Sequence, residues 1–346
     1  MKIAIIGAGA IGSVAAALLT KTGADITLVG KQDQAEAINK KGLKLSGVIN
    51  ETIPVKAVTQ LDQRYDLVIF TTKSQDLEAA YQHNVDFMEE CLVLTSQNGV
   101  QSDTILGSHF DREKMFSSIV MFGATYIKPG EVTYNFPGDW IIGKPYSPID
   151  PKTHEIADIL KKAFNVVITE DIVGMKWTKL FVNFNNCIPA LLGKSMQETF
   201  ADMDFCHLSI KLLKEGFGII KAANIELVSL PQFSTEKISG LVGMPENQAA
   251  AIINKTLTSL SKEPLYGSIL QSIMRGRTSE IDFINGEVVH LARQIRREAP
   301  LNEKIVEMVH QVENTDTFFK PDEVKDKFDC ASSASDIITG GLKKEA

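Results

Sequence analysis

The sequence is poor in cysteine and has no surplus of positive charge. Only four of its 346 residues are cysteines, they lie far apart, and they form no CxxC pair. This excludes a disulfide framework and a zinc site of the usual spacing, so we expect free thiols and no bound metal. Lys and Arg number 36 against 43 Asp and Glu, which gives a formal charge of -7. Because phosphate backbones are bound by an excess of Lys and Arg, we expect no nucleic-acid partner, whereas a small anionic ligand is still allowed.

Long apolar stretches are also scarce. Residues 3–19 carry no charge and follow Lys2, an arrangement that imitates a signal peptide or a short membrane span. Three glycines interrupt this stretch, and each weakens a helix by about 1 kcal/mol relative to alanine. A membrane span also needs roughly 20 apolar residues. A buried strand, a glycine turn and a helix explain the stretch better, so we expect a cytoplasmic protein with no membrane partner.

The length and composition indicate a folded protein of two domains. Hydrophobic residues make up 44% and charged residues 23% of the chain, as in ordinary globular proteins. In the first half, short apolar runs alternate with helical patterns, which indicates βαβ units on a parallel sheet. We predict strands at residues 2–6, 25–29, 66–70, 91–95, 116–124, 131–135 and 140–143, a hairpin of residues 43–45 and 52–58, and helices at 11–19, 32–40 and 74–83.

The pattern changes after about residue 165. From residue 171 to about residue 313, apolar residues recur at helical spacing. The sequence therefore predicts an α/β protein in which an N-terminal Rossmann-type, doubly wound parallel sheet (residues 1–167) is followed by an all-helical C-terminal domain (residues 168–312). The polar segment 313–346 is interpreted as a weakly attached C-terminal tail or one short extra helix.

A glycine motif joins the first predicted strand to the first predicted helix. It reads Gly7-Ala8-Gly9-Ala10-Ile11-Gly12 and fits GxGxxG. The first glycine permits a tight turn, the second lets a pyrophosphate approach the backbone, and the third lets helix and strand pack closely. The helix N-terminus adds unpaired N–H groups for the phosphates. A small-residue turn that serves packing only is the alternative, but the position between strand and helix favours a dinucleotide.

The end of the second predicted strand distinguishes NAD from NADP. NAD binders usually place an acidic residue there to bind the ribose 2′-hydroxyl. Here the strand runs into Gly30, Lys31 and Gln32, with no acid at that point. Lys31 can contact a 2′-phosphate as a point charge, or it can be an ordinary surface lysine. The missing acid favours NADP(H) as the cofactor.

Polar clusters follow two further strands of the predicted sheet. The first is TTK at residues 71–73, and the second is QNG at residues 97–99. Because ligands bind at the carboxyl ends of such strands, we expect Lys73 and Asn98 to lie beside the cofactor and the substrate.

Two more clusters lie in the helical half. Lys179 and Asn183 are four residues apart and share one face of a predicted helix. Ser268 follows a glycine, and Glu280 lies twelve residues further on. The alternatives are a surface lysine with its stem on the core, an exposed Glu280–Arg277 ion pair and a serine that only turns the chain.

Together these motifs resemble the ketopantoate reductases, also called 2-dehydropantoate 2-reductases, over residues 1 to about 312. The resemblance rests on GAGAIG, TTK, QNG, WTKLFVN and SILQSIMRGRTSEIDFING, in that order. It implies NADPH-dependent reduction of a small 2-oxo acid to a 2-hydroxy acid. The most specific expectation is reduction of ketopantoate to pantoate in pantothenate and coenzyme A biosynthesis.

The resemblance also implies roles for individual residues. Lys179 would be the catalytic lysine, Lys73 would lie beside cofactor and substrate, and the substrate would be held by Asn98, Asn183, Ser268 and Glu280. The chemistry agrees, because hydride addition makes a ketone oxygen negative, and Lys179 can stabilise that charge and deliver the proton. Glu280 can accept from a substrate hydroxyl and help to keep the ammonium protonated, so we count it with Lys179 as catalytic.

The chain departs from the family pattern at several positions. Cys187 stands eight residues after Lys179, where the family commonly has a second Asn, and Asn186 one position earlier can reach the same face. Leu265 replaces another Asn, and Ser272 replaces an acid. Two alternatives therefore stay open: a paralogue that reduces a different 2-oxo acid, and a non-catalytic NADP-binding sensor. The sequence leaves the oligomeric state open as well, a homodimer included.

Overall fold

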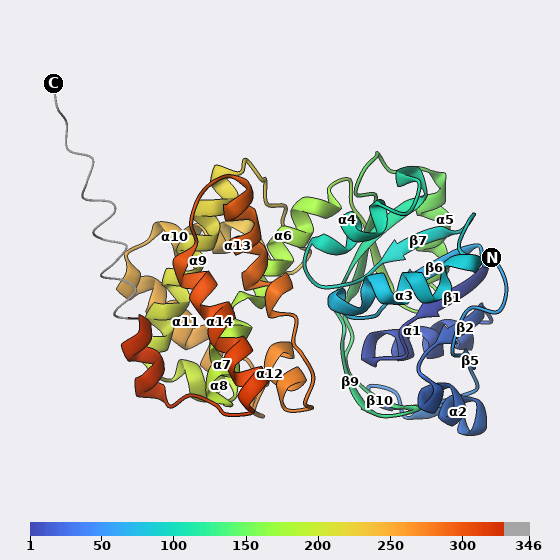
Figure 1. The fold of residues 1–346 in the computed structure, drawn as a ribbon, viewed down its shortest axis with the longest axis horizontal. Helices are drawn as coiled ribbons and strands as arrows, with labels where there is room; N and C mark the ends of the chain where they lie inside the picture. The colour runs from blue at the N-terminus through green and yellow to red at the C-terminus, as the bar shows by residue number, and fades with distance from the viewer. Residues whose placement is uncertain (329–346) are drawn as a thin grey trace. The chain divides into compact units, whose positions relative to one another are not determined.

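A computed structural model describes residues 1–328; residues 329–346, which include Cys330 and most of the predicted tail, lie outside the described residues. The chain divides into two compact units, Met1–Lys176 and the residues from Trp177 onward. In Figure 1 the first unit combines strands and helices, and the second is built from helices. The predicted fold class is confirmed.

The first unit is built on an eight-stranded, mostly parallel sheet. Its strands are β1 (Lys2–Ile6), β2 (Asp25–Val29), β5 (Lys56–Val58), β6 (Leu67–Phe70), β7 (Leu92–Thr95), β8 (Met115–Val120), β11 (Asp139–Gly143) and β12 (Asn165–Ile168). They lie in the order β12-β11-β8-β7-β6-β1-β2-β5, and only the β11–β8 pair is antiparallel. Strands β7, β6, β1 and β2 are neighbours, so the loops that follow them lie along one edge of the sheet.

Helices cover both faces of this sheet. Because side chains alternate along a strand, Ile3 and Ile5 of β1 join a different core from Ala4 and Ile6. The first core contains residues of α1 (Ala10–Lys21), α2 (Gln32–Lys41) and α5 (Pro151–Leu160), and the second contains residues of α3 (Leu77–Asn84) and α4 (Gln101–Gly107). The sheet is therefore doubly wound.

A second sheet of four strands packs on the α1 face. It has the order β4-β3-β10-β9 and consists of β3 (Leu43–Gly47), β4 (Glu51–Ile53), β9 (Gly123–Lys128) and β10 (Glu131–Phe136). The predicted hairpin is present, because β3 pairs antiparallel with β4. The predicted extents of residues 52–58 and 116–124 were wrong, because neither segment is a single strand. Each splits between the two sheets, into β4 and β5 and into β8 and β9. Pro54 lies at the first break, where it has no N–H for a sheet hydrogen bond.

The second unit is helical throughout its described residues. Its helices are α6 (Ile172–Asn183, which begins in the first unit), α7 (Cys187–Leu192), α8 (Met196–Phe200), α9 (Met203–Ala222), α10 (Thr235–Gly243), α11 (Glu246–Thr258), α12 (Ser268–Ile273), α13 (Asn285–Gln294) and α14 (Pro300–Thr315). The long helix α9 packs against α8, α10, α11, α13 and α14. No helix in the described part of the chain is both long and apolar enough to cross a membrane.

The described part of the segment after residue 313 packs on this helical unit. Residues 321–328 form a further helix, and Val324 within it is fully buried. Lys325 forms ion pairs of 2.8 Å with Asp202 and Asp204, which lie at the start of α9. This helix is thus attached to the start of α9 by two ion pairs, and it contributes the buried Val324 to the apolar interior.

Candidate active site

The glycine loop between β1 and α1 has the geometry of a phosphate-binding turn. Gly7 has φ +121°, and a Cβ there would lie 2.7 Å from the backbone nitrogen of Thr72. A Cβ on Gly12 would lie 2.0 Å from the Gly7 carbonyl oxygen, whereas a Cβ on Gly9 would meet nothing within 4 Å. The first and third glycines are therefore required by the fold, and the second leaves open space over the loop.

A dinucleotide fits this loop. The N-cap of α1 is Gly9, so no side chain satisfies the N–H groups of its first turn. The Thr72 hydroxyl next to the loop is buried and has no hydrogen-bond partner among the described residues. Thr71 holds the loop in place, because its Oγ1 donates to the Gly7 carbonyl at 2.9 Å. The Gly7 N–H donates to the Val29 carbonyl at 2.9 Å, so the donors that could meet the phosphates of a dinucleotide are those at the start of α1.

The turn after β2 is tied to the same loop. Lys31 is exposed at the N-cap of α2, and its backbone N–H donates to Gln34 Oε1 at 2.9 Å. The Nε2 of Gln34 donates to the Ala8 carbonyl at 2.9 Å. Sequence reasoning missed Gln34, although glutamine at the third position of a helix is a known capping signal. Gln34 fixes the position of Lys31 relative to the glycine loop.

Lys73 and Asn98 are brought together at the adjacent strand ends. Lys73 directly precedes the 3-10 helix η1 (Ser74–Asp76) after β6, and Asn98 lies in the loop after β7. The Ser74 hydroxyl donates to the Asn98 carbonyl at 3.1 Å, and Gln97 Nε2 donates to the Thr72 carbonyl at 3.1 Å. The TTK and QNG segments are thus joined by hydrogen bonds, and they lie beside the glycine loop.

In the second unit, Lys179 and Asn183 lie one turn apart on α6. Burial lowers the pKa of the Lys179 ammonium from 10.5 to about 8. Removal from water disfavours a charged amine, and the result is a lysine that gives up its proton more readily than a surface lysine does. Proton-donating lysines in enzymes are tuned in this direction.

Asn186 packs against Gly267, the residue before Ser268. Asn186 ends the 3-10 helix η4 (Phe184–Asn186), and Ser268 begins α12. A Cβ on Gly267 would lie 2.7 Å from Asn186 Oδ1, so the amide packs directly against the residue before Ser268. Cys187, by contrast, is fully buried, and burial raises the pKa of its thiol to about 12. The Cys187 side chain therefore packs in the core as a neutral thiol.

Glu280 precedes the 3-10 helix η5 (Ile281–Phe283) in the turn between α12 and α13. The N–H of the preceding Ser279 donates to Glu313 Oε1 of α14 at 2.7 Å. The turn that carries Glu280 is therefore attached to α14.

Lys176, three residues before Lys179, has a different environment. Its Nζ lies 2.8 Å from Asp103 Oδ2 and 3.1 Å from Ser102 Oγ, and its side chain is only 2% exposed. Both partners lie in the first turn of α4. Lys176 is thus engaged in a buried ion pair that attaches the start of α6 to the α/β unit.

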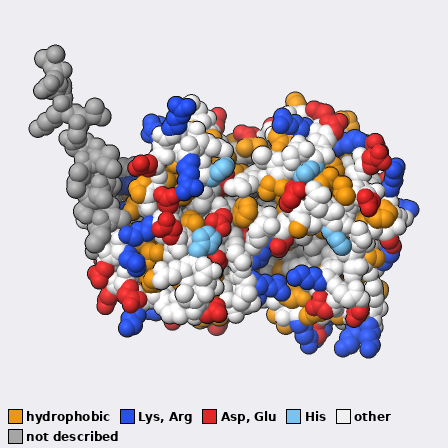
Figure 2. Space-filling model, in the orientation of Figure 1, with side chains coloured by type: hydrophobic (Ala, Val, Ile, Leu, Met, Phe, Trp, Pro, Cys, Tyr) orange, Lys and Arg blue, Asp and Glu red, His pale blue; other side chains and the backbone are white. Residues whose placement is uncertain are grey.

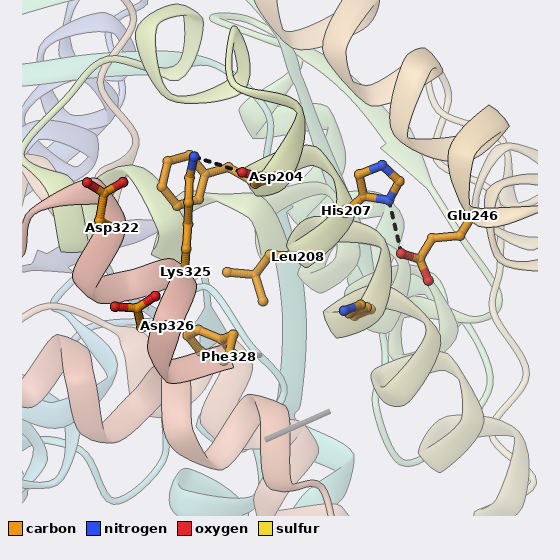
Figure 3. Close-up of a pocket in the computed structure, with 10 residues that line it drawn as sticks. Asp204, His207, Leu208, Glu246, Asp322, Lys325, Asp326 and Phe328 are labelled. Carbon is orange, nitrogen blue, oxygen red and sulfur yellow. Dashed lines mark hydrogen bonds and ion pairs between the residues drawn. The ribbon is translucent and has the colours of Figure 1, made fainter. Parts of the chain in front are cut away.

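A cavity of about 430 Å³ opens in the helical unit, and it is lined by other residues. Its lining is mostly charged, and Figure 3 shows His207 paired with Glu246 and Lys325 with Asp204 around it. Acidic and basic side chains are likewise interspersed over the face drawn in Figure 2. Since no predicted site residue lines the cavity, we do not assign the chemistry to it.

Comparison with known proteins gives the family. The family model for ketopantoate reductase PanE/ApbA matches residues 3–146, and the model for its C-terminal domain matches residues 171–313. A 2-dehydropantoate 2-reductase of Pyrococcus horikoshii is 33% identical over 311 residues, which cover 87% of this chain and 94% of the relative. The corresponding protein of Pyrococcus abyssi is 30% identical over 307 residues, with the same coverage of 87% and 94%.

Solved structures share the fold. A PanE/ApbA-family ketopantoate reductase from Ralstonia eutropha has a TM-score of 0.77 at 24% identity, over 91% of this chain and 99% of that chain. A D-mandelate dehydrogenase, solved with NADH and anilino(oxo)acetate, has a TM-score of 0.78 at 22% identity, with the same coverage of 91% and 99%. At these identities the likeness concerns the fold alone.

The doubly wound sheet and its glycine loop define a Rossmann-type protein, the class that binds dinucleotides. Because the two family models together match most of the chain, the protein belongs to the ketopantoate reductase family. The resemblance predicted from the motifs is confirmed. Members of the family are NAD(P)-dependent 2-oxo acid reductases, so the protein is an oxidoreductase that uses a nicotinamide cofactor and acts on a small 2-oxo acid.

Proposed function

We propose that the protein reduces a 2-oxo acid to its 2-hydroxy acid with NADPH, and that its substrate is ketopantoate, which gives pantoate for coenzyme A biosynthesis. The observation that carries the proposal is Lys179, an amine with a pKa of about 8 on the family's WTKLFVN helix. We assign cofactor binding to the domain of residues 1–167, and proton transfer and substrate binding mainly to residues 168–312.

In the proposed mechanism, the cofactor is the hydride donor and the protein provides the proton and binds the substrate. A bound nicotinamide supplies the hydride. Lys179 stabilises the negative charge that develops on the carbonyl oxygen and then donates its proton to that oxygen. Glu280 accepts a hydrogen bond from a substrate hydroxyl and favours the charged form of the lysine.

Neutral side chains complete the proposed substrate site. Asn183 follows Lys179 by one turn of α6, and Asn186 packs against Gly267, the residue before Ser268. Amides and hydroxyls can bind a carboxylate without adding a counter-charge, and we assign the same role to Asn98. Lys73, next to Asn98, adds a positive charge for the anionic cofactor and substrate.

The choice of NADPH rests on the turn after β2. No carboxylate occupies residues 30–32, and the exposed Lys31 is held near the glycine loop by Gln34. A 2′-phosphate would meet a cation at this turn, whereas a 2′-hydroxyl would lack its usual acceptor. We therefore propose NADP(H) over NAD(H).

A different 2-oxo acid is the second candidate, favoured by two substitutions. Cys187 is buried in the core and provides no amide, and Leu265 is 39% exposed where the family commonly has Asn. An apolar side chain at that position would suit a substrate with a larger hydrocarbon part. Family membership argues against the third alternative, a non-catalytic sensor.

The test is NADPH oxidation by the purified protein with ketopantoate and with a panel of branched and aromatic 2-oxo acids. We expect the highest kcat/KM for ketopantoate, and a higher kcat/KM for NADPH than for NADH. A higher kcat/KM for another acid would establish the second candidate. If no 2-oxo acid were reduced with either cofactor, the proposed function would be wrong.

A further inference from the structure

Two residues of α14 hold the turn that carries Glu280 from both sides. On one side, the N–H of Ser279 donates to Glu313 Oε1 at 2.7 Å. On the other, His310 Nε2 lies 2.9 Å from Asp282 Oδ1. His310 and Glu313 also contact each other, with Nδ1 3.0 Å from Oε2. These hydrogen bonds are connected to one another, and they hold the turn on both sides of Glu280.

The helix that provides these groups is itself firmly placed. At its start, Glu215 of α9 accepts hydrogen bonds from the N–H groups of Leu301 and Asn302, at 3.0 and 2.8 Å. Along its length α14 packs against α7, α9, α13 and η5. Figure 1 shows α13 and α14 in the same part of the helical unit. The contacts made by His310 and Glu313 therefore attach the turn to a helix, α14, that is itself packed in the core of the helical unit.

The geometry around His310 requires its charged form. Both ring nitrogens face carboxylate oxygens, and only the imidazolium can donate from both nitrogens at once. Burial by itself lowers the pKa of the ring, but the hydrogen bonds to Asp282 from η5 and Glu313 from the same helix raise it above 6.5. These two carboxylates are the charged groups that act most strongly on the ring.

We propose that His310 and Glu313 form a pH-dependent clamp that positions Glu280 for the substrate. Below the pKa of His310 both of its hydrogen bonds are made and the turn is held on both sides. When the ring loses its proton, one nitrogen becomes an acceptor facing a carboxylate, so one bond is lost and the turn loosens. This inference rests on the proposed role of Glu280, and it assigns His310 and Glu313 as positioning residues.

The first experiment measures the pKa of His310 and does not depend on enzymatic activity. The His310 ring is titrated by NMR in the wild type and in Glu313→Gln, with His310→Gln used to assign its signal. We expect a pKa above 6.5 in the wild type and a lower value in Glu313→Gln, whose amide can still accept from Ser279. A wild-type pKa at or below 6.5, or no change in the variant, overturns the proposal.

The second experiment measures exchange of the turn. Hydrogen exchange of residues 277–284, corrected for the intrinsic effect of pH, is compared between wild type, His310→Gln and a control, His290→Gln. His290 is an exposed histidine of the neighbouring helix α13 that contacts Gln294. We expect faster exchange in His310→Gln at acidic pH and no change in the control. Wild-type exchange in His310→Gln overturns the clamp.

The third experiment connects the clamp to Glu280. His310→Gln should raise the KM for the 2-oxo acid by about tenfold, the effect of one weakened charge-assisted hydrogen bond, and leave the NADPH Kd unchanged. An unchanged KM in a wild-type-active enzyme overturns the positioning role while the proposed function stands. If the wild type itself reduces no 2-oxo acid, the proposed function fails, and with it the role for Glu280, even if the NMR and exchange results show a clamp.

Discussion

At the scale of single residues, the account depends on the proton of Lys179. Its pKa of about 8 means that the ammonium dominates at neutral pH and is lost in mildly alkaline solution. A proton donor must carry its proton when the substrate reacts.

This pKa predicts the pH dependence of the reaction. We expect kcat/KM for the 2-oxo acid to be level toward neutral pH and to fall about tenfold per pH unit above a midpoint near 8. The profile is measured with the wild type and with His310→Gln, since loss of the His310 proton would lower activity separately in the wild type. A profile that stays level well above pH 8 in both would contradict proton donation by Lys179.

The proposed preference for NADPH also depends on one residue, Lys31. Lys31→Ala should raise the Kd for NADPH by about tenfold and leave the Kd for NADH within about twofold, because only NADPH has a 2′-phosphate to contact. Lys40→Ala, an exposed lysine at the other end of α2, is the matched control and should change neither. Equal effects of Lys31→Ala on both cofactors would refute the NADP assignment.

At the scale of elements, α6 carries both the buried ion pair of Lys176 and the proposed proton donor, Lys179. Its first turns are attached to α4 through Lys176, and its next turn carries Lys179. Asp103 also accepts hydrogen bonds from Thr95 and Ser117, so the ion pair belongs to a buried polar network. A charge in such a network is costly to leave without its partner.

Removing that partner should therefore destabilise the protein. Lys176→Met should lower the free energy of unfolding by about 3–5 kcal/mol, because the Asp103 carboxylate would remain buried without its cation. Lys161→Met, which removes only an exposed ion pair with Asp158, should have no measurable effect. Urea denaturation of both variants makes the comparison. A stability loss in Lys176→Met no larger than in the control would show that the pair contributes little.

The elements themselves were predictable where the pattern is local. The strands β1, β2, β6 and β7 and the helices α1 and α2 follow from short apolar runs and helical spacing. Helix α5 was not predicted, although Asp150 caps it and Pro151 occupies its first turn. Helix α4, which is only seven residues long, was not predicted either. The two split strands could not be predicted from alternation, because alternation does not show which sheet a residue joins.

At the scale of the whole molecule, binding of the cofactor should stabilise the folded chain. A ligand at 100 times its Kd adds about 2.7 kcal/mol to the free energy of unfolding. At equal concentrations, we therefore expect NADPH to raise the Tm by more than NADH does, as measured by thermal denaturation. A larger shift with NADH would overturn the cofactor assignment independently of any activity.

The candidate site was predictable to the extent that its residues lie in short motifs. The glycine loop, TTK and QNG follow strands directly, so their place at the edge of the sheet could be inferred. The supporting contacts could not, because their partners are distant in sequence: Gln34 bonds Ala8 26 positions away, Glu313 bonds Ser279 34 positions away, and Lys176 bonds Asp103 73 positions away. Such contacts are set by tertiary packing and leave no local pattern.

The central claim is that the Lys179 ammonium protonates the reduced carbonyl, and turnover by Lys179→Met tests it most directly. With NADPH and the best 2-oxo acid, the account predicts that kcat falls by at least about a hundredfold while the NADPH Kd stays within a few-fold. Lys221→Met, an exposed lysine at the end of α9, should retain wild-type kcat. A Lys179→Met enzyme with wild-type turnover would contradict the account.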